Sequence, residues 1–524
     1  MVGLEIAVIL GFAVLAGGLA RRYLRIPAPW AWLAIGAGLS FLPGLHEVAL
    51  PPDVVLYLFL PALLYWEALN TSLQLFRYDL RVILLLSVGL VFATAAAITG
   101  IGSLLGLAVP VALVLGAVLS PTDATAVSAM APPLPRRLDT MLRGESLVND
   151  GSALALYSVA VAAVVAGRDP SVGEISLRFL WSVAGGVLAG LVAGYLLYLL
   201  RRIAQQPSLA GTISVLSPFA LYLPAEMIHG SGVVAVVTGG LLLGRLMPRT
   251  VSAQSRTLGF DFWRVATYVI NGTLFVLIGL QARAVFELFS EEGWQSLLLL
   301  GVLCVVTIFA VRLAWVALMA QVIRLVDRRP SQRERRVPFR TRLVLVWGGF
   351  RGAISLAAAL AVPVATASGD PFPGREILIA VTFIVIVLLL IGQGATMPWV
   401  VRRARIPDEH EDLDERHFAT VESIAAALEH LDADAAEERA PDSVRTEVRE
   451  RLEQDLLHAR EAAEHDAGDV ADDAIRRLLL RTVERKRAQV ERLRSDGRID
   501  DGVFLDVQRA IDHEELQLRD NPDD

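Results

Sequence analysis

Long apolar segments are the feature that most restricts how this chain can fold. A helix that crosses a lipid bilayer needs about 17 to 25 mainly apolar residues, and thirteen segments before residue 402 meet this requirement. They are approximately residues 4–20, 28–45, 52–69, 82–107, 109–131, 141–166, 176–200, 208–226, 230–247, 260–282, 296–325, 341–368 and 375–401. The sequence therefore predicts an all-α, polytopic membrane protein with about thirteen transmembrane helices.

Charged residues divide the chain into two parts. They are sparse within the apolar segments and dense from Pro407 to Asp524. We therefore predict a membrane body at residues 1–405 and a soluble helical domain at residues 406–524. In that C-terminal part, apolar residues recur at helical spacing over residues 424–431 and 474–480.

The composition argues against several functions. The formal net charge of −7 comes mostly from the C-terminal part, and no basic cluster alternates with aromatic residues, so we expect no nucleic-acid binding. Cys304 is the only cysteine, which excludes an internal disulfide and a thiolate metal cluster. The sequence has no phosphate-binding glycine loop with Lys and Ser or Thr, and nothing ties His229 to a nucleophile. We therefore expect no ATP coupling, no cofactor and no enzymatic activity.

Basic residues gather in every second connection between the apolar segments, which is the distribution found in cytoplasmic loops. The basic connections carry Arg21, Arg22, Arg25, Arg77, Arg81, Arg136, Arg137, Arg201, Arg202, Arg249, Arg256, residues 328–342, Arg402, Arg403 and Arg405. The other connections are mostly uncharged or acidic, with Glu47, Glu287, Glu291, Glu292 and Asp370, and with Arg168, Arg178, Arg283 and Arg375 as exceptions. We therefore predict an external N-terminus and a cytoplasmic C-terminal domain.

Several ionisable residues lie inside the apolar segments, where a charge costs about 2.5 to 3.5 kcal/mol. These residues are Glu67, Asp123, Glu145, Asp150, Arg312 and Arg351. In the sixth segment, Glu145, Ser146, Asn149 and Asp150 fall within an arc of about 140° on a helix. A polar seam between helices is the alternative to an ion site. Asp150 favours the ion site because a lone carboxylate is a costly way to join helices, whereas both interpretations stay open for Ser146 and Glu145.

Two apolar segments carry helix breakers in corresponding positions. Pro121 in the fifth segment lacks the backbone N–H that a helix requires, so the helix should break beside Asp123. The twelfth segment is interrupted by glycines at positions 348, 349 and 352. A separation of seven segments reverses the orientation across the membrane. This pattern predicts inverted repeats with two broken helices that cross near the bilayer midplane.

The two arginines inside apolar segments need partners, because a guanidinium does not lose its proton in proteins. We predict that Arg351 pairs with Glu67 and that the Asn149 amide bridges them as a structural clamp. Arg312 is a rival partner for Glu67. Its own counter-charge stays open, and a position at the membrane interface is an alternative.

Six segments together resemble the sodium/proton exchanger family of monovalent cation:proton antiporters, over almost the whole membrane body. They are Phe59-Leu-Pro through Glu67-Ala-Leu-Asn70, Ser120-Pro-Thr-Asp123, Gly144-Glu-Ser-Leu-Val-Asn-Asp150, His229-Gly-Ser-Gly-Val-Val-Ala235, Asn271-Gly-Thr-Leu-Phe-Val-Leu-Ile-Gly279 and Phe350-Arg-Gly-Ala-Ile-Ser355. The resemblance implies a six-helix core domain, a dimerisation domain, a homodimer in the plasma membrane and an elevator-like movement. It also implies a regulatory C-terminal domain, whose ligand or partner the sequence does not indicate.

The resemblance also implies roles for single residues. Those expected to bind the cation and the proton are Asp150, Asp123, Thr122, Ser146 and Glu145. Those expected to organise the core are Asn149, Glu67 and Arg351. The dipeptide Asn149-Asp150 is similar to the electroneutral branch of the family.

The chemistry of these residues suits exchange of a small cation for a proton. Na⁺ is a hard cation that prefers oxygen ligands, and Asp150, Thr122, Ser146 and carbonyls near Pro121 offer them. One carboxylate that holds either Na⁺ or H⁺ predicts 1:1 electroneutral antiport, because an empty ionised site would cross the membrane only at high cost. Li⁺ and K⁺ remain alternatives to Na⁺. A cation channel is a distant alternative, because a channel would favour a continuous polar pore.

Overall fold

The computed structural model describes most of the chain. The described residues are 2–42, 54–167, 172–204, 206–247, 251–291, 294–326, 337–406, 411–438, 440–464, 470–496, 498, 503–504, 507–508, 510–512 and 514–515. Within them the chain is helical, with one isolated β-bridge between Ala365 and Pro371 and no strand. It forms two compact units, residues 1–407 and 408–524. The prediction of an all-α protein is confirmed.

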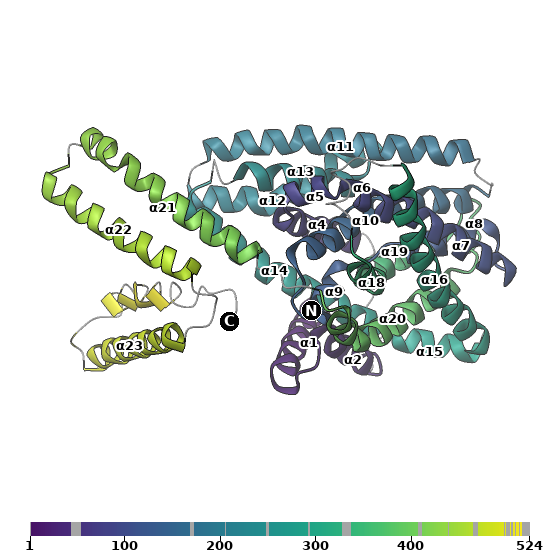
Figure 1. Ribbon diagram of the computed structural model, residues 1–524. Coiled ribbons are helices and arrows are strands. Elements are labelled where there is room, and N and C mark those ends of the chain that lie inside the picture. Colours follow the sequence, from purple (N-terminus) through teal and green to yellow (C-terminus); the bar gives the residue numbers. More distant parts are fainter. Residues whose placement is uncertain are drawn as a thin grey trace. The chain divides into compact units, whose positions relative to one another are not determined.

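The helices of the first unit follow the predicted apolar segments one by one (Figure 1). They are α1 (Val2–Leu24), α2 (Ala28–Leu39), η1 (Val55–Phe59) with α4 (Leu60–Asn70), α6 (Leu80–Leu84) with η2 (Leu85–Gly89) and α7 (Leu90–Leu104), α8 (Val109–Leu119) with α9 (Ala124–Met130), α10 (Arg136–Ala166), α11 (Val172–Ile203), α12 (Pro207–Met227), α13 (Gly232–Leu246), α14 (Ala253–Leu280), α16 (Trp294–Val326), α18 (Phe339–Trp347) with α19 (Ala353–Leu360), and α20 (Arg375–Ala404). Among the described residues, eight helices are long and apolar enough to cross a membrane, and the bent pair α8–α9 makes a ninth. Shorter apolar helices and the pair α18–α19 occupy the other predicted segments, so the polytopic membrane fold is confirmed.

Some predicted boundaries are wrong. The twelfth segment was expected to continue to residue 368, but α19 ends at Leu360, because Pro363 cannot continue a helix. The second helix ends at Leu39 rather than near residue 45. Two short helices, α5 (Leu73–Tyr78) and α15 (Ala282–Glu291), were not predicted, since both are shorter than a bilayer crossing. Parts of the loops that carry the predicted orientation lie outside the described residues, namely Glu47, Arg168, Arg249, Glu292 and residues 328–336.

The helices of the first unit pack in two groups. In one group, α7 packs against α8 and α16, α8 against α10, and α20 against α16, α18 and α19. In the other group, α1, α2 and α14 pack together, as do α11, α12 and α13, and α13 also contacts α4. Figure 1 shows α11 running beside α12 and α13. A Cβ atom on Gly190 of α11 would lie 2.5 Å from the Ala235 carbonyl oxygen of α13, so the small residue permits this close approach.

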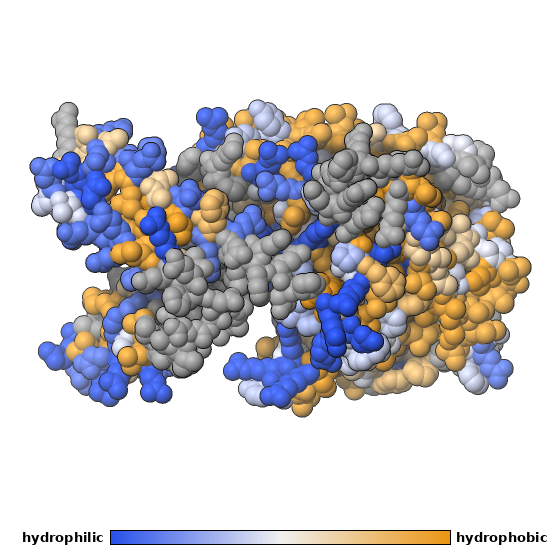
Figure 2. Space-filling view, in the orientation of Figure 1, coloured by the Kyte–Doolittle hydropathy of each residue, from blue (hydrophilic) through white to orange (hydrophobic). Residues whose placement is uncertain are grey.

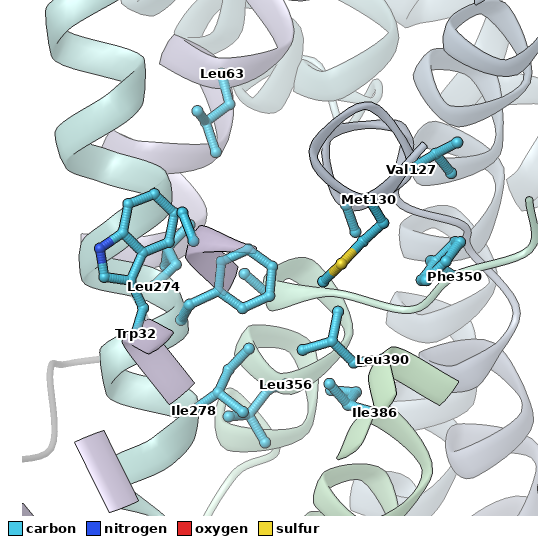
Figure 3. Packing of buried hydrophobic residues seen from close by; sticks show 14 of the residues in the cluster. Trp32, Leu63, Val127, Met130, Leu274, Ile278, Phe350, Leu356, Ile386 and Leu390 are labelled. Atoms are coloured by element: carbon cyan, nitrogen blue, oxygen red, sulfur yellow. The ribbon is translucent and has the colours of Figure 1, made fainter. Parts of the chain in front are cut away.

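An apolar cluster joins the two groups (Figure 3). Trp32 of α2 and Leu274 of α14 come from the second group. Met130 of α9 and Leu390 of α20 come from the first, and Figure 3 shows Met130 between Leu274 and Phe350. The contact between the groups is therefore mainly a surface of interdigitated apolar side chains. One directed bond crosses it nearby, from Trp30 Nε1 to the Leu390 carbonyl at 3.0 Å.

The surfaces of the two units differ in hydropathy. Orange, apolar residues cover much of the visible surface of the first unit, whereas the second unit is mainly blue in the same view (Figure 2). The second unit contains α21 (Glu411–Glu437), α22 (Asp442–Glu464) and α23 (Val470–Ser495), and α21 packs against α22. Arg449 Nη2 lies 2.8 Å from Asp432 Oδ1 between these two helices. Lipid contact suits the first surface, and water suits the second.

Candidate ion-binding site

The first helix break lies between α8 and α9. The helix axes bend by 45° across residues 120–123. Asp123 begins α9 as its N-cap: its Oδ1 accepts hydrogen bonds from the backbone N–H groups of Thr125 (2.9 Å) and Ala126 (3.1 Å). These bonds satisfy N–H groups that a helix start leaves without partners. Asp123 therefore organises the break through its side chain.

The second break meets the first. Helix α18 ends at Trp347, residues 348–352 are extended or turned, and α19 begins at Ala353. The backbone N–H of Asp123 donates to the Phe350 carbonyl at 3.0 Å, so the two interrupted segments are bonded to each other. The prediction of two broken, crossing helices is confirmed. The starts of both α9 and α19, where helix dipoles are positive, lie at this crossing.

Gly352 stands directly against Asp123. A Cβ atom built on Gly352 would overlap Oδ2 of that carboxylate. Only glycine permits this approach, so the breaker in the second segment also makes room for the acidic residue of the first.

We expect Gly352→Ala to disrupt the crossing. The added methyl would displace Asp123 or push the breaks apart, and overpacking of this kind costs about 1–3 kcal/mol. The measurement is thermal stability of the purified protein, together with proton exchange in liposomes. Gly392→Ala is the matched control, because a Cβ on Gly392 of α20 meets nothing within 4 Å. Equal behaviour of the two variants would contradict the tight contact.

Arg351 binds the broken end of α8. Its Nε donates to the Leu119 carbonyl at 2.9 Å and its Nη2 to the Ser120 carbonyl at 3.3 Å, while Nη1 donates to the Gly349 carbonyl. The predicted pair between Arg351 and Glu67 is therefore wrong. Carbonyl groups at the end of a broken helix lack hydrogen-bond partners and carry negative partial charge. They therefore bind the Arg351 guanidinium, for which the sequence suggested the Glu67 carboxylate.

Glu67 and Asn149 also differ from the predicted clamp. Glu67 lies buried on α4, and its side chain has no hydrogen bond or ion pair among the described residues. The Asn149 amide donates to Thr122 Oγ1 at 2.6 Å instead of bridging Glu67 and Arg351. Asn149 thus ties α10 to the first break.

Arg312 has the partner that the sequence left open. Both terminal nitrogens of its guanidinium bind the Glu145 carboxylate, with Nη2 at 2.8 Å from Oε2. Nε and Nη2 also donate to the Leu345 carbonyl near the end of α18, at 3.0 and 2.8 Å. Both side chains are buried. Glu145, one of the predicted cation ligands, is therefore held in an ion pair that joins α10 to α16.

Two hydroxyl groups connect α10 with the first break. Ser146 Oγ donates to the Thr122 carbonyl at 3.0 Å and accepts from the Ala124 N–H at 3.3 Å. Thr122 Oγ1 donates to Glu145 Oε1 at 3.2 Å. The predicted polar arc lies buried on α10, but most of its side chains bind the first break or Arg312.

Asp150 is the exception on this arc. Its side chain is 1% exposed, and neither carboxylate oxygen has a hydrogen-bond partner in the described part of the chain. The Asn149 side-chain oxygen is also without a partner there. The carboxylates of Glu67 and Asp123 lie close enough to act on Asp150 electrostatically. A buried carboxylate without a bound donor is costly unless a proton or a cation neutralises it.

The polar groups of α10 and of the first break carry oxygen atoms, which are the ligands that hard cations prefer. The described residues contain no cluster of three or more His, Cys, Asp or Glu side chains placed to hold a metal ion. At the first break and on the facing arc of α10, oxygens come from the carboxyl groups of Asp123 and Asp150, the hydroxyls of Thr122 and Ser146, and the Asn149 amide. A cation there would meet carboxyl as well as neutral oxygens.

Arg375 also binds a helix end, although in the sequence it is only an exception to the charge distribution of the loops. In the structure, its Nε donates to the Val362 carbonyl at 2.9 Å and its Nη2 to the Leu360 carbonyl at 3.2 Å. These carbonyls lie at the end of α19, where a helix leaves carbonyl groups without hydrogen-bond partners. Arg375 donates to them, as Arg351 donates to the carbonyls at the end of α8. No local pattern in the sequence indicates this contact, because Arg375 follows Pro363 by twelve residues.

Crossed helix breaks beside a buried, open carboxylate define this membrane protein as an ion-coupled secondary transporter. The family model described as sodium/hydrogen exchanger, transmembrane, matches residues 9–403. The chain belongs to this family of cation/proton antiporters.

Relatives extend over both parts of the chain. An uncharacterised Na⁺/H⁺ exchanger of Mycobacterium tuberculosis is 42% identical over 99% of this chain and 97% of its own length. The Na⁺/H⁺ antiporter ApNhaP of Aphanothece halophytica is 30% identical over 76% of this chain and 73% of its own length. The structure of the sodium proton antiporter MjNhaP1 from Methanocaldococcus jannaschii at pH 8 matches with a TM-score of 0.60 at 18% identity, over 77% of this chain and 99% of that one. This structural likeness supports the fold.

Proposed function

We propose that this protein exchanges Na⁺ or Li⁺ for H⁺ at Asp150, one ion for one proton, without net charge movement. The observation that carries the proposal is the carboxylate of Asp150, buried and without a partner among the described residues. A single negative charge can be neutralised by one cation or by one proton. Competition for that charge couples the two fluxes.

The neighbours of Asp150 take supporting roles in the proposal. Asp123, Thr122 and Ser146 lie at the break beside α10 and are the candidates for further oxygen ligands. Asn149 orders the same break through its bond to Thr122. Glu145 acts in the ion pair with Arg312 rather than as a ligand.

Two further residues complete these roles. Arg351 secures the end of α8 through its bonds to carbonyls there. Glu67 adds a second buried carboxyl group near Asp150. Together they would keep the crossing ordered.

Alternating access is proposed to occur by movement of the group that contains both breaks against the group that contains α1, α2 and α11–α14. The apolar cluster between the groups supports this, because dispersion contacts are not directional and allow sliding. The movement would require a neutralised Asp150, since an ionised site meets a larger barrier in the membrane. We further propose a homodimer in the plasma membrane with an external N-terminus.

K⁺ is the second candidate for the transported cation. A relative from Bacillus pumilus, 31% identical over 71% of this chain and 57% of its own length, is named a sodium, potassium, lithium and rubidium/H⁺ antiporter. That name is the specific observation in favour of K⁺. The second unit, residues 408–524, is proposed to lie in the cytoplasm and to regulate transport.

Electroneutral exchange predicts that membrane voltage does not change the Na⁺ gradient at which proton flux stops. If one net charge moved per cycle, a voltage change of 100 mV would contribute about 2.3 kcal/mol and would shift that gradient roughly 50-fold. The measurement uses proteoliposomes with an internal pH dye, titrated with Na⁺ or Li⁺ at two clamped voltages that differ by about 100 mV. A 50-fold shift would contradict 1:1 exchange, and flux that does not saturate with cation concentration would favour a channel. K⁺ is titrated in a separate experiment, without an ionophore that would carry K⁺ across the membrane.

A further inference from the structure

Arg201 of α11 is a buried arginine that none of the roles above uses. It is 4% exposed. Its Nη2 donates to the Tyr65 hydroxyl at 2.8 Å and to the Ser217 hydroxyl at 2.9 Å. Its Nε has no hydrogen-bond partner in the described part of the chain, and Nη1 donates no hydrogen bond there either. The guanidinium therefore has donors left for a ligand.

The other buried arginines of the described residues have stronger acceptors. Arg312 binds the Glu145 carboxylate, and Arg351 binds backbone carbonyls at the two helix breaks. Arg201 binds two neutral hydroxyls. It lies in the last turn of α11, where the helix dipole favours a positive charge, but no full negative charge is bonded to it. Because a buried ion without an opposite charge is costly, an anion beside Arg201 would be stabilised.

A small pocket lies beside Arg201, where α11 meets the starts of α12 and α14 and the ends of α4 and α13. Its free volume of about 20 Å³ is enough for a single particle of about the size of a water molecule. None of the described residues that line it is acidic. Leu69, Met247 and Phe260 contribute apolar walls, which strengthen electrostatic interactions inside the pocket.

Two serine hydroxyls add hydrogen-bond donors to the pocket wall. Ser214 Oγ of α12 accepts a hydrogen bond from Trp263 Nε1 at 3.0 Å. Ser255 Oγ of α14 accepts from the Ser252 hydroxyl at 2.9 Å. Neither Ser214 nor Ser255 donates its hydroxyl proton to an acceptor among the described residues, so both protons can bind a ligand. The wall thus offers a positive charge and hydroxyl donors without a carboxylate.

We propose that this pocket binds a chloride ion, held by the Arg201 guanidinium and by the hydroxyls of Ser214 and Ser255. A chloride ion is only slightly larger than a water molecule and accepts several hydrogen bonds, so it suits both the free volume and the donors. A phosphate group or a phospholipid headgroup has several atoms of this size and exceeds the pocket. The chloride neutralises Arg201 and links α11, α12 and α14, independently of exchange at Asp150.

The test measures the Tm of the purified protein in detergent, at constant Na⁺ concentration and ionic strength, with chloride or gluconate as the anion. Gluconate is too large for the pocket. We expect chloride at about ten times its Kd to raise the Tm by about 2 °C. Equal Tm values in chloride and gluconate would overturn the site. Stabilisation by added phosphatidylglycerol but not by chloride would identify a lipid headgroup instead, and would also overturn it.

Arg201→Gln removes the positive charge and should abolish the rise in Tm that chloride causes, whatever it does to the Tm in gluconate. Arg202→Gln is the matched control, because Arg202 is the next residue of α11, is exposed and does not line the pocket. The control should keep the full rise.

Gly259→Ala tests the pocket without changing Arg201. Gly259 of α14 lines the pocket, and a Cβ there would meet only Ser214 Oγ, at 3.8 Å, so a methyl group fits without a clash and occupies the space. The variant should fold, because Ala is favoured over Gly within a helix, and should lose the chloride effect. Gly211→Ala on α12 is its control, since that Cβ meets nothing within 4 Å and Gly211 does not line the pocket. A chloride effect that persists in Arg201→Gln or in Gly259→Ala would overturn the proposal.

Discussion

Asp150→Asn is expected to reduce Na⁺-driven proton exchange to the level of protein-free liposomes. Asn has nearly the same shape as Asp, so the packing of α10 should survive. It carries no negative charge and does not take up a proton near neutral pH. The variant would therefore lose the group for which cation and proton are proposed to compete, and neither half of the cycle could proceed.

The experiment measures acidification or alkalinisation inside proteoliposomes after a Na⁺ step, with the variant first shown to be folded by size-exclusion chromatography. Asp261→Asn serves as the control, because Asp261 is an exposed carboxylate on α14 that pairs with Arg264. We expect the control to exchange at the rate of the unmodified protein. Clear exchange by a folded Asp150→Asn protein would refute the assignment of the site.

Arg312→Gln should cost about 3–5 kcal/mol of unfolding free energy. Breaking a buried ion pair at one partner leaves the other charge buried without compensation. Here the stranded group would be Glu145, and the Leu345 carbonyl would lose its donors as well. The double variant Glu145→Gln/Arg312→Gln should recover much of the loss, because no buried charge is then left alone.

Stability can be measured by titration with a denaturing detergent in mixed micelles. Arg264→Gln is the matched control: it removes an arginine of an exposed ion pair with side-chain exposures of 77% and 55%, for which we expect at most about 1 kcal/mol. If Arg312→Gln destabilises the protein no more than Arg264→Gln does, the pair with Glu145 does not hold α10 and α16 together. A double variant as unstable as the single one would point to lost packing instead of an uncompensated charge.

Most of the membrane fold could be predicted because its signals are local. A run of apolar residues of sufficient length predicts a crossing helix wherever it occurs. Pro121 and the glycines at 348, 349 and 352 interrupt helices by their own backbone chemistry, and both breaks appear where they were expected. The short helices α5 and α15 are not predicted because they are too short for that criterion.

The sequence by itself determined which segments are helical, where two of them break and which helices carry charges. The tertiary structure decided what each charge touches. Arg351 takes carbonyls of α8 instead of Glu67, Arg312 takes Glu145, and Asp150 is left without a described partner. The reason is that carbonyl groups at helix ends and carboxylates can both accept hydrogen bonds from the same guanidinium groups. Such a bond requires a donor–acceptor distance of about 3 Å, and only the packing of helices that are far apart in the chain sets that distance.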